Sequence, residues 1–263
     1  MNWIGNHESG ENGNENLIKS VETSIAIVEC LQERRSATVS EISEETGGSK
    51  GNVSKHLATL AKHGFVEKTD SGYQLGLRYL DLGGFVRDGI QGSHVLKSKI
   101  RELADITGEV AQFAVESNGR SVIIYRESGQ QGVSTRTRVG RYLPMHQVAS
   151  GKALLAYMPE AEVESIIHRH GLPAATENTI TDEETLYKEL TEVRERKIAV
   201  NDAESTKGLY AVAAPITMSG GSVIGACSVS GPSHRMRDQT KLDDIEDTLL
   251  SFVNEIELNL TYS

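Results

Sequence analysis

Residues 49–63 carry basic and short polar side chains on one side of a predicted helix and contain no acidic residue. On the other side, Val53, Leu57 and Leu60 recur at the i, i+4, i+7 spacing of one buried helix face. Lysines attract DNA phosphates, and amide or basic side chains can hydrogen-bond to base edges in the major groove. The candidate DNA contacts of this helix are Ser49, Lys50, Asn52, Ser54, Lys55 and His56.

Two earlier helices are expected to position this basic helix. The first is predicted to end near Arg34 and Arg35, and Thr38 with Glu41 predicts a capping box for a second, short helix. Gly47-Gly48 then predicts a tight turn before the N-cap Ser49. The apolar stripe expected to anchor the first helix is Ile18, Val21, Ile25, Val28 and Leu31.

A β-hairpin is predicted directly after the basic helix, with strands at 65–68 and 73–75 around an Asp/Ser/Gly turn. Helix, short helix, turn, helix and hairpin together indicate a winged helix-turn-helix over residues 17–76. Lys68 and Ser71 of the wing are expected to contact phosphate or the minor groove. The competing interpretation of the basic helix is a solvated surface, but the flanking turn and hairpin favour DNA contact.

Composition sets outer bounds on the rest of the chain. The 263 residues carry a net charge of −10, yet residues 17–75 hold seven Lys or Arg and eight Asp or Glu, so the acidity lies mostly elsewhere. Residues 1–16 are rich in Asn, Glu and Gly, which indicates a disordered tail. The sequence has two cysteines and shows neither a long apolar run nor a signal peptide. These features predict a cytoplasmic protein without disulfides or membrane contact, and we expect no cofactor and no metal site.

The sequence after residue 76 predicts an α+β domain at 93–263. A linker helix at 77–92 is expected to join it to the winged helix-turn-helix, and the exposed apolar residues of this helix are expected to pair with a partner helix. We expect strands at 110–115, 122–125, 132–139, 209–217 and 222–230, one strand residue at Val200, and helices at 95–107, 149–158, 159–168, 182–197 and 237–260. Ser150 lies where a loop enters a helix, and backbone N–H groups there attract anions. Ser228 and Ser230 alternate on a strand and therefore share a side.

An enzymatic function is disfavoured. Ser150-Gly151-Lys152 lacks the earlier glycine and the following Ser or Thr of a phosphate-binding loop, because His146 and Ala153 occupy those positions. Ser150 with His146 could form a nucleophile pair, but no G-x-S-x-G elbow and no placed acid accompany it. A packed, hydrogen-bonded role is the favoured interpretation of His146.

The chain resembles the IclR family of bacterial and archaeal regulators, and we expect an archaeal member. The resemblance rests on VSEISEETGGSKGNVSKHLATLAKHGFVEKTDSGYQLG, VGRYLPMHQVASGKALLAYMP, NDAESTKGLYAVAAPI and GACSVSGPSHR, in that order over residues 17–260. It implies a C-terminal GAF-like effector-binding domain with a central antiparallel sheet. The positions that match the family's effector contacts are Ala149, Ser150, Asn201, Ala211, Ser228 and Ser230.

Departures from the family pattern concern ligands rather than fold. The family commonly has Arg where this chain has Lys55, and Gly where it has Lys197. It commonly has an acidic residue at the position of Asn201 and a small residue at the position of Gln147. The resemblance implies a transcription regulator that binds a pseudo-palindromic DNA operator as a homodimer or homotetramer. Its small-molecule effector is expected to be a carboxylate or sugar acid. The alternative that the sequence leaves open is an architectural DNA-binding protein that needs no effector.

Overall fold

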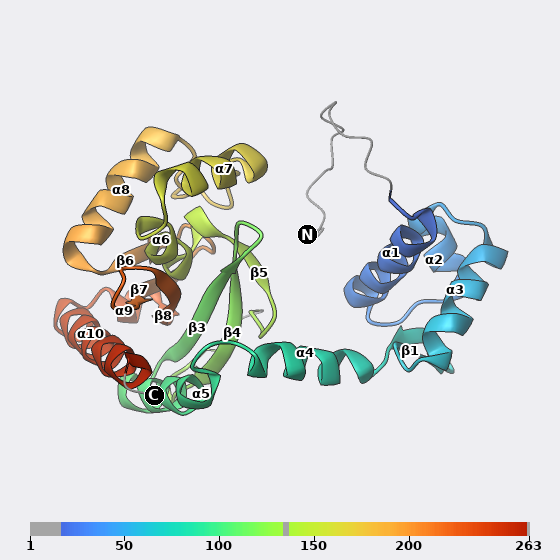
Figure 1. Ribbon diagram of the computed structural model, residues 1–263, viewed down its shortest axis with the longest axis horizontal. Helices are drawn as coiled ribbons and strands as arrows, with labels where there is room; N and C mark the ends of the chain where they lie inside the picture. The colour runs from blue at the N-terminus through green and yellow to red at the C-terminus, as the bar shows by residue number, and fades with distance from the viewer. Residues whose placement is uncertain (1–16, 134–136, 262–263) are drawn as a thin grey trace. The chain divides into compact units, whose positions relative to one another are not determined.

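The computed structural model describes residues 17–133 and 137–261, which form two compact units that divide between Asp88 and Gly89 (Figure 1). The tail expected at residues 1–16 lies outside the described residues. The expected linker at 77–92 is divided by this boundary, because its helical part belongs to the first unit and residues 89–92 belong to the second.

The first unit is a winged helix-turn-helix. Its elements are α1 (Lys19–Arg34), α2 (Val39–Thr46), α3 (Lys50–Lys62), β1 (Val66–Thr69), β2 (Gly72–Leu75) and α4 (Arg78–Asp88). The capping box is confirmed: Thr38 Oγ1 accepts from the Glu41 backbone N–H at 3.3 Å, and Glu41 Oε2 accepts from the Thr38 N–H at 2.7 Å. Gly47 is left-handed at φ 67°, which ends α2 and turns the chain toward α3.

The wing is tied to the loop between α1 and α2. Ala37 and Tyr73 exchange two backbone hydrogen bonds of 3.0 and 2.8 Å. Gly72 lies at φ 133°, and a Cβ there would lie 2.5 Å from the Ala37 carbonyl oxygen. The close approach of these two backbone segments therefore needs glycine at this position.

The predicted core face of α1 is only partly right. Leu31 is buried, but Ile18, Val21 and Ile25 are 66%, 51% and 47% exposed. The residues of α1 that reach the core are Ile27, Cys30 and Leu31, which pack with Ile42, Val53, Leu57 and Val66. A three-helix unit covers only one side of α1, so the remaining apolar stripe stays open to solvent.

The second unit is built on one antiparallel sheet in the order β5-β4-β3-β8-β7-β6. Its strands are β3 (Val110–Ser117), β4 (Arg120–Ser128), β5 (Tyr142–Pro144), β6 (Ala199–Asp202), β7 (Leu209–Thr217) and β8 (Val223–Pro232). The α+β prediction is confirmed, and β7 has the predicted bounds. The strand expected at 132–139 is wrong for residues 132–133 and 137–139, which are not in a strand; residues 134–136 lie outside the description. The edge strand is instead β5, which follows that segment.

Helices cover both faces of the sheet (Figure 1). One face packs against α5 (Ser93–Thr107) and α10 (Gln239–Thr261) through larger side chains such as Phe113 and Val229. The other packs against α6 (Ala149–Ala156), α7 (Glu160–His170) and α8 (Glu183–Arg196) through small ones such as Ala213 and Ala226. Two short helices, η1 (Met145–Gln147) and α9 (Ser233–Met236), complete the unit. In the part of the chain that is described, no helix combines the length and apolarity needed to cross a bilayer.

A buried carboxylate joins the start of β3 to the C-terminal segment. Glu109 is fully buried and accepts from Arg235 Nε at 2.6 Å, Arg235 Nη2 at 2.7 Å and Lys241 Nζ at 2.6 Å. Burial alone would raise the pKa of Glu109, but the hydrogen bonds from both cations outweigh it and hold the pKa below its usual value. The ion cluster thus fixes α9 and the beginning of α10 against the sheet.

Candidate DNA interface and effector site

The polar side of α3 is open to solvent. Val53 and Leu57 are fully buried on its opposite side and fix the rotation of the helix about its axis. The exposed predicted DNA contacts on this element are the N-cap Ser49, whose Oγ accepts from the Asn52 N–H at 3.3 Å, and Lys50, Asn52, Ser54 and Lys55. The structure therefore brings these five residues together on one accessible surface, which we call the α3 polar face.

His56 occupies a different place from the other predicted α3 contacts. Its Nδ1 lies 2.8 Å from Ser24 Oγ on α1, and the ring is half-buried between the two helices. This contact favours a structural role in holding α1 against α3 over a contact with DNA. The DNA role of His56 remains a prediction.

The two wing residues are both exposed. Lys68 lies on β1, paired across the hairpin with Tyr73. Ser71 lies at the tip, where its Oγ is 3.1 Å from Thr69 Oγ1 and 3.1 Å from Ser36 Oγ. Ser71 can therefore hold the wing tip in shape as well as approach a phosphate.

Four of the six predicted effector residues share one face of the sheet. The register pairs Asn201 with Ala211, Ala211 with Ser230, and Ala213 with Ser228, so these side chains point to the same side as the small residues under α6. Ser228 is buried and Ser230 is half-buried. We call this surface the serine face.

The other two predicted residues begin α6, which packs over the same side of the sheet. Ala149 is buried in the cluster that contains Ala211 and Ala213. Ser150 is also buried, and its Oγ lies 3.0 Å from Ser121 Oγ on β4. This hydrogen bond ties the beginning of α6 to the sheet.

Two residues of the serine face were missed from the sequence. Gln112 on β3 pairs with Ser228 on one side and with Arg126 of β4 on the other, and both Gln112 and Arg126 are half-buried. The row Arg126–Gln112–Ser228 places a cation and an amide beside the serines. Strand alternation could have identified Gln112, but the predicted strand at 122–125 stopped before Arg126.

Asn201 caps its own loop. Its Oδ1 accepts from the Glu204 N–H at 2.9 Å and from the Ser205 N–H at 3.4 Å, and its Nδ2 donates to Ser205 Oγ at 2.8 Å. These contacts use both ends of the amide. Asn201 therefore shapes the β6–β7 loop in this structure, and its contact with an effector remains a prediction.

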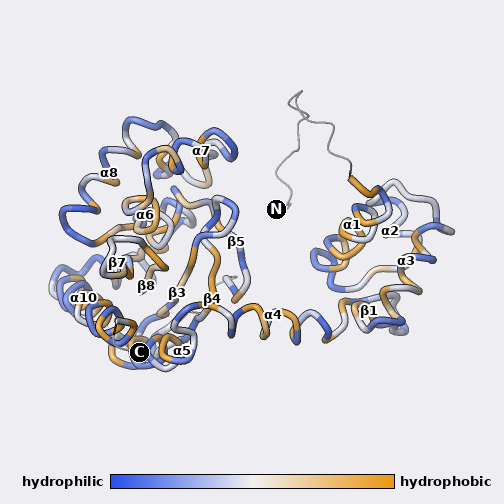
Figure 2. Tube along the Cα trace, in the orientation of Figure 1, coloured by the Kyte–Doolittle hydropathy of each residue, from blue (hydrophilic) through white to orange (hydrophobic). Residues whose placement is uncertain are grey.

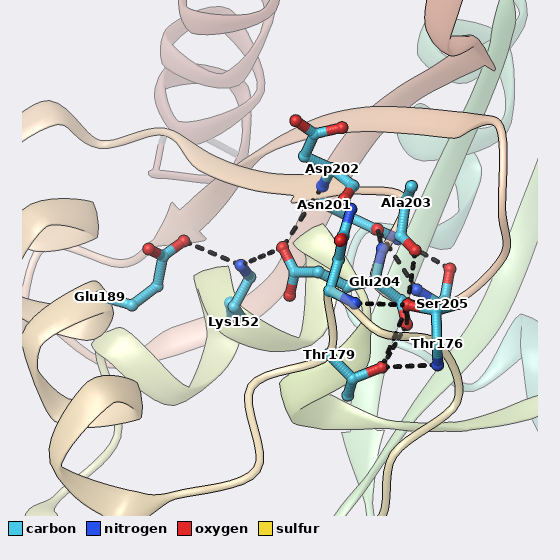
Figure 3. A network of polar contacts seen from close by, with 10 residues as sticks. Lys152, Thr176, Thr179, Glu189, Asn201, Asp202, Ala203, Glu204 and Ser205 are labelled. Carbon is cyan, nitrogen blue, oxygen red and sulfur yellow. Dashed lines mark hydrogen bonds and ion pairs between the residues drawn. The ribbon is translucent and has the colours of Figure 1, made fainter.

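A buried lysine connects α6, α8 and the β6–β7 loop (Figure 3). Lys152 is 1% exposed, and its Nζ donates to Glu189 Oε1 and to Glu204 Oε1, both at 2.8 Å. Burial is the main cause that raises the pKa of Glu204, and its Oε2 has no hydrogen-bond partner among the described residues. Thr179 Oγ1 donates to the Glu204 carbonyl at 2.7 Å, which adds a backbone tie to the same loop.

No group of three or more His, Cys, Asp or Glu side chains in residues 17–133 and 137–261 is arranged to hold a metal ion. The two cysteines, Cys30 and Cys227, are buried free thiols. Burial raises the pKa of Cys227 to about 12, which leaves it without nucleophilic character near neutral pH.

Comparison with known families accounts for both units. Residues 20–70 match the IclR helix-turn-helix domain, and residues 89–258 match the bacterial transcriptional regulator IclR C-terminal domain. The chain belongs to the IclR family. It is a DNA-binding transcription regulator with an effector-binding domain, not an enzyme.

Two relatives span nearly the whole chain, and a third covers part of it. The Probable HTH-type transcriptional regulator ArcR of Halobacterium salinarum is 29% identical over 96% of this chain and 98% of its own length. The crystal structure of the Thermotoga maritima IclR has a TM-score of 0.75 at 28% identity, covering 92% of this chain and 97% of that one. A double mutant of the PobR inducer-binding domain from Acinetobacter has a TM-score of 0.57 at 26% identity, over 62% of this chain and 96% of that one.

Replacing Lys152 with methionine should destabilise the protein by about 3–5 kcal/mol, because two carboxylates would lose their shared buried cation. Urea unfolding followed by circular dichroism measures the loss. The Lys152→Met/Glu204→Gln double variant should recover part of it, since one uncompensated charge is removed with the lysine. Lys188→Met, an exposed change next to Glu189, is the matched control. Equal stability of Lys152→Met and the wild type would show that the ion cluster does not hold these elements together.

Proposed function

We propose that this IclR regulator binds a pseudo-palindromic operator as a homodimer or homotetramer, with the α3 polar face in the major groove. The observation that carries the proposal is the accessible, acid-free surface formed by Lys50, Asn52, Ser54 and Lys55. An α-helix fits the major groove, and its polar side chains can reach phosphates and base edges there. Ser49, Lys68 and Ser71 add contacts at the edges, and the proposed site of action is the cytoplasm.

Exposed apolar side chains support the oligomer. Leu77, directly before α4, is 75% exposed, and Leu80 and Phe85 on α4 are 74% and 80% exposed. Figure 2 shows several hydrophobic residues along this helix. Ile18, the N-cap of α1, and Val21 on α1 are also exposed. Apolar surface of this extent on one unit is typical of protein–protein contacts. A second copy of the chain is the partner that we propose, because a palindromic operator requires two-fold symmetry.

We further propose that a small carboxylate or sugar acid binds the serine face. Ser228 and Ser230 offer hydroxyls, Gln112 an amide and Arg126 a guanidinium on the same side of the sheet, which suits an anionic ligand with hydrogen-bonding groups. The relative PobR domain is described as a complex with 3-hydroxybenzoic acid, a carboxylate. Ala149, Ser150, Asn201 and Ala211 would line the same site.

The effector acts only through a difference in its affinity for two states of the protein. The coupling free energy is commonly about 1–3 kcal/mol. The match of residues 89–258 to an effector-binding domain favours this regulator over the architectural alternative. Similarity to the Halobacterium salinarum regulator and the net charge of −10 support an archaeal origin.

Lys55→Ala should weaken operator binding by roughly tenfold and reduce the slope of log affinity against log salt by about one, because one phosphate contact is lost. Fluorescence anisotropy with labelled operator DNA, identified first by footprinting, measures both quantities. Lys97→Ala, an exposed change on α5, is the control and should bind as the wild type does. Unchanged affinity and salt slope in Lys55→Ala would contradict the placement of α3 on DNA.

Ser230→Ala should leave operator affinity unchanged and weaken the response to the effector, because a hydroxyl that holds the ligand is removed. A thermal-shift screen of small carboxylates and sugar acids identifies the ligand, which stabilises the protein as RT ln(1 + [L]/Kd). Ser222→Ala, in the exposed turn before β8, is the control. An effector response that is the same in Ser230→Ala as in the control would move the site away from the serine face.

Phe85→Glu and Leu80→Glu should each convert the oligomer to a smaller species without unfolding it, since both side chains are largely exposed within one chain. Sedimentation velocity at several protein concentrations provides the measurement. Ser222→Glu adds the same charge at a distant exposed turn and should not change the sedimentation. If both α4 variants sediment as the wild type does, the apolar side chains of α4 do not form the interface.

A further inference from the structure

Arg120 is a half-buried cation for which no side-chain hydrogen bond or ion pair is found in residues 17–133 and 137–261. It begins β4 directly after the Asn118-Gly119 turn. Burial lowers the pKa of its guanidinium, which is the direction expected when a charge loses water without gaining a partner. A guanidinium held in this way has unused donors that an anion can satisfy.

Two histidines line the same hollow as Arg120, and none of its lining residues is acidic. His146 is 4% exposed on η1, and His170 ends α7. After burial, the charge of Arg120 is a further cause that lowers the pKa of both imidazoles, so all three groups lie within electrostatic reach of one another. Arg120 is therefore the permanent cation among the lining residues of this hollow, and none of these residues is an acidic counter-ion.

The hydrogen bonds of the two rings fix their tautomers. His146 Nε2 lies 3.1 Å from the Pro173 carbonyl oxygen, and His170 Nε2 lies 2.8 Å from the Asn118 carbonyl oxygen. A carbonyl only accepts, so each Nε2 carries a proton and donates. Nδ1 of each ring is therefore the nitrogen that can still take up a proton, and an anion near the ring would favour that protonation.

The size of the hollow and the charges on the adjoining surface limit which ligands can bind. The hollow lined by Arg120, His146 and His170, which we call the inner hollow, has a cavity volume of about 10 Å³. This volume is enough for one ligand oxygen. An outer hollow of about 160 Å³ shares Gly119 and Ile166 with it and carries Glu116, Glu162 and Arg169. Two carboxylates against one guanidinium disfavour a second negative group there. A monoanion fits this arrangement better than a polyanion does.

We propose that Arg120, His146 and His170 form a second ligand site, distinct from the serine face, which binds a small monocarboxylate. The carboxylate places one oxygen beside Arg120 in the inner hollow, and the rest of the molecule lies in the outer hollow against Met158 and Ile166. The neighbour of Arg120 is Ser121, whose hydroxyl bonds to Ser150 at 3.0 Å. Occupancy of the second site can therefore influence the beginning of α6 through one side chain.

Isothermal titration calorimetry on the full chain tests the proposal, with sodium propionate as the probe and the ionic strength held constant with sodium chloride. We expect saturable binding to the wild type and binding weakened by roughly tenfold in Arg120→Met, since a charge-assisted contact is removed. Arg101→Met, an exposed change on α5, should bind as the wild type does, and Ser230→Ala should retain the component of propionate binding that Arg120→Met loses. Succinate and inorganic phosphate should bind more weakly than propionate.

A second measurement separates a ligand-binding arginine from a structural one. Without propionate, Arg120→Met should be at least as stable to heat as the wild type, because an unpaired half-buried charge is removed. Propionate should raise the melting temperature of the wild type but not of this variant. His170→Gln retains an amide donor for Asn118 and should bind propionate more weakly. Equal propionate binding by Arg120→Met and wild type would overturn the proposal. So would loss of the Arg120-dependent component of binding in Ser230→Ala, or no saturable binding by the wild type.

Discussion

Helix α6 can lie close to the sheet because the side chains beneath it are small. Ala199, Ala213 and Ala226 come from three neighbouring strands and are all fully buried under it. The helix is equally restricted on its own side: a Cβ at Gly151 would lie 2.2 Å from the Met145 carbonyl oxygen. Larger residues on either side would force the layers apart, and overpacking of this kind is destabilising. Two other features of the second unit follow from this close contact.

One consequence is the burial of charge. With α6 against the sheet, Lys152 has no path to water, and the protein supplies Glu189 from α8 and Glu204 from the β6–β7 loop as partners. A buried ion pair of this type contributes less to net stability than to the choice of one arrangement, because desolvation offsets much of the attraction. The cluster thus makes the loop that Asn201 caps part of the rigid framework.

The serine face shows the second consequence. Its residues change along the sheet from fully buried alanines to the half-buried Gln112, Arg126 and Ser230. The polar residues lie on the same side as the alanines but where coverage is less complete, so a ligand can replace water there. The first unit likewise separates buried from exposed residues, because the buried Val53 and Leu57 set which side of α3 faces outward.

The sequence by itself determined the local features and the family. The capping box of Thr38 and Glu41, the N-cap Ser49 and the bounds of β7 follow from interactions within a few residues or from strand alternation, which are encoded where they occur. The polar side of α3 was predictable for the same reason. Only the tertiary structure decided which stripe of α1 is buried, that β5 lies at the end of the strand order, and that His56 contacts Ser24. It also brought Arg120, His146 and His170 to one hollow from three separate segments. Burial and pairing of this kind depend on partners distant in the chain, which periodicity and spacing within one segment do not specify.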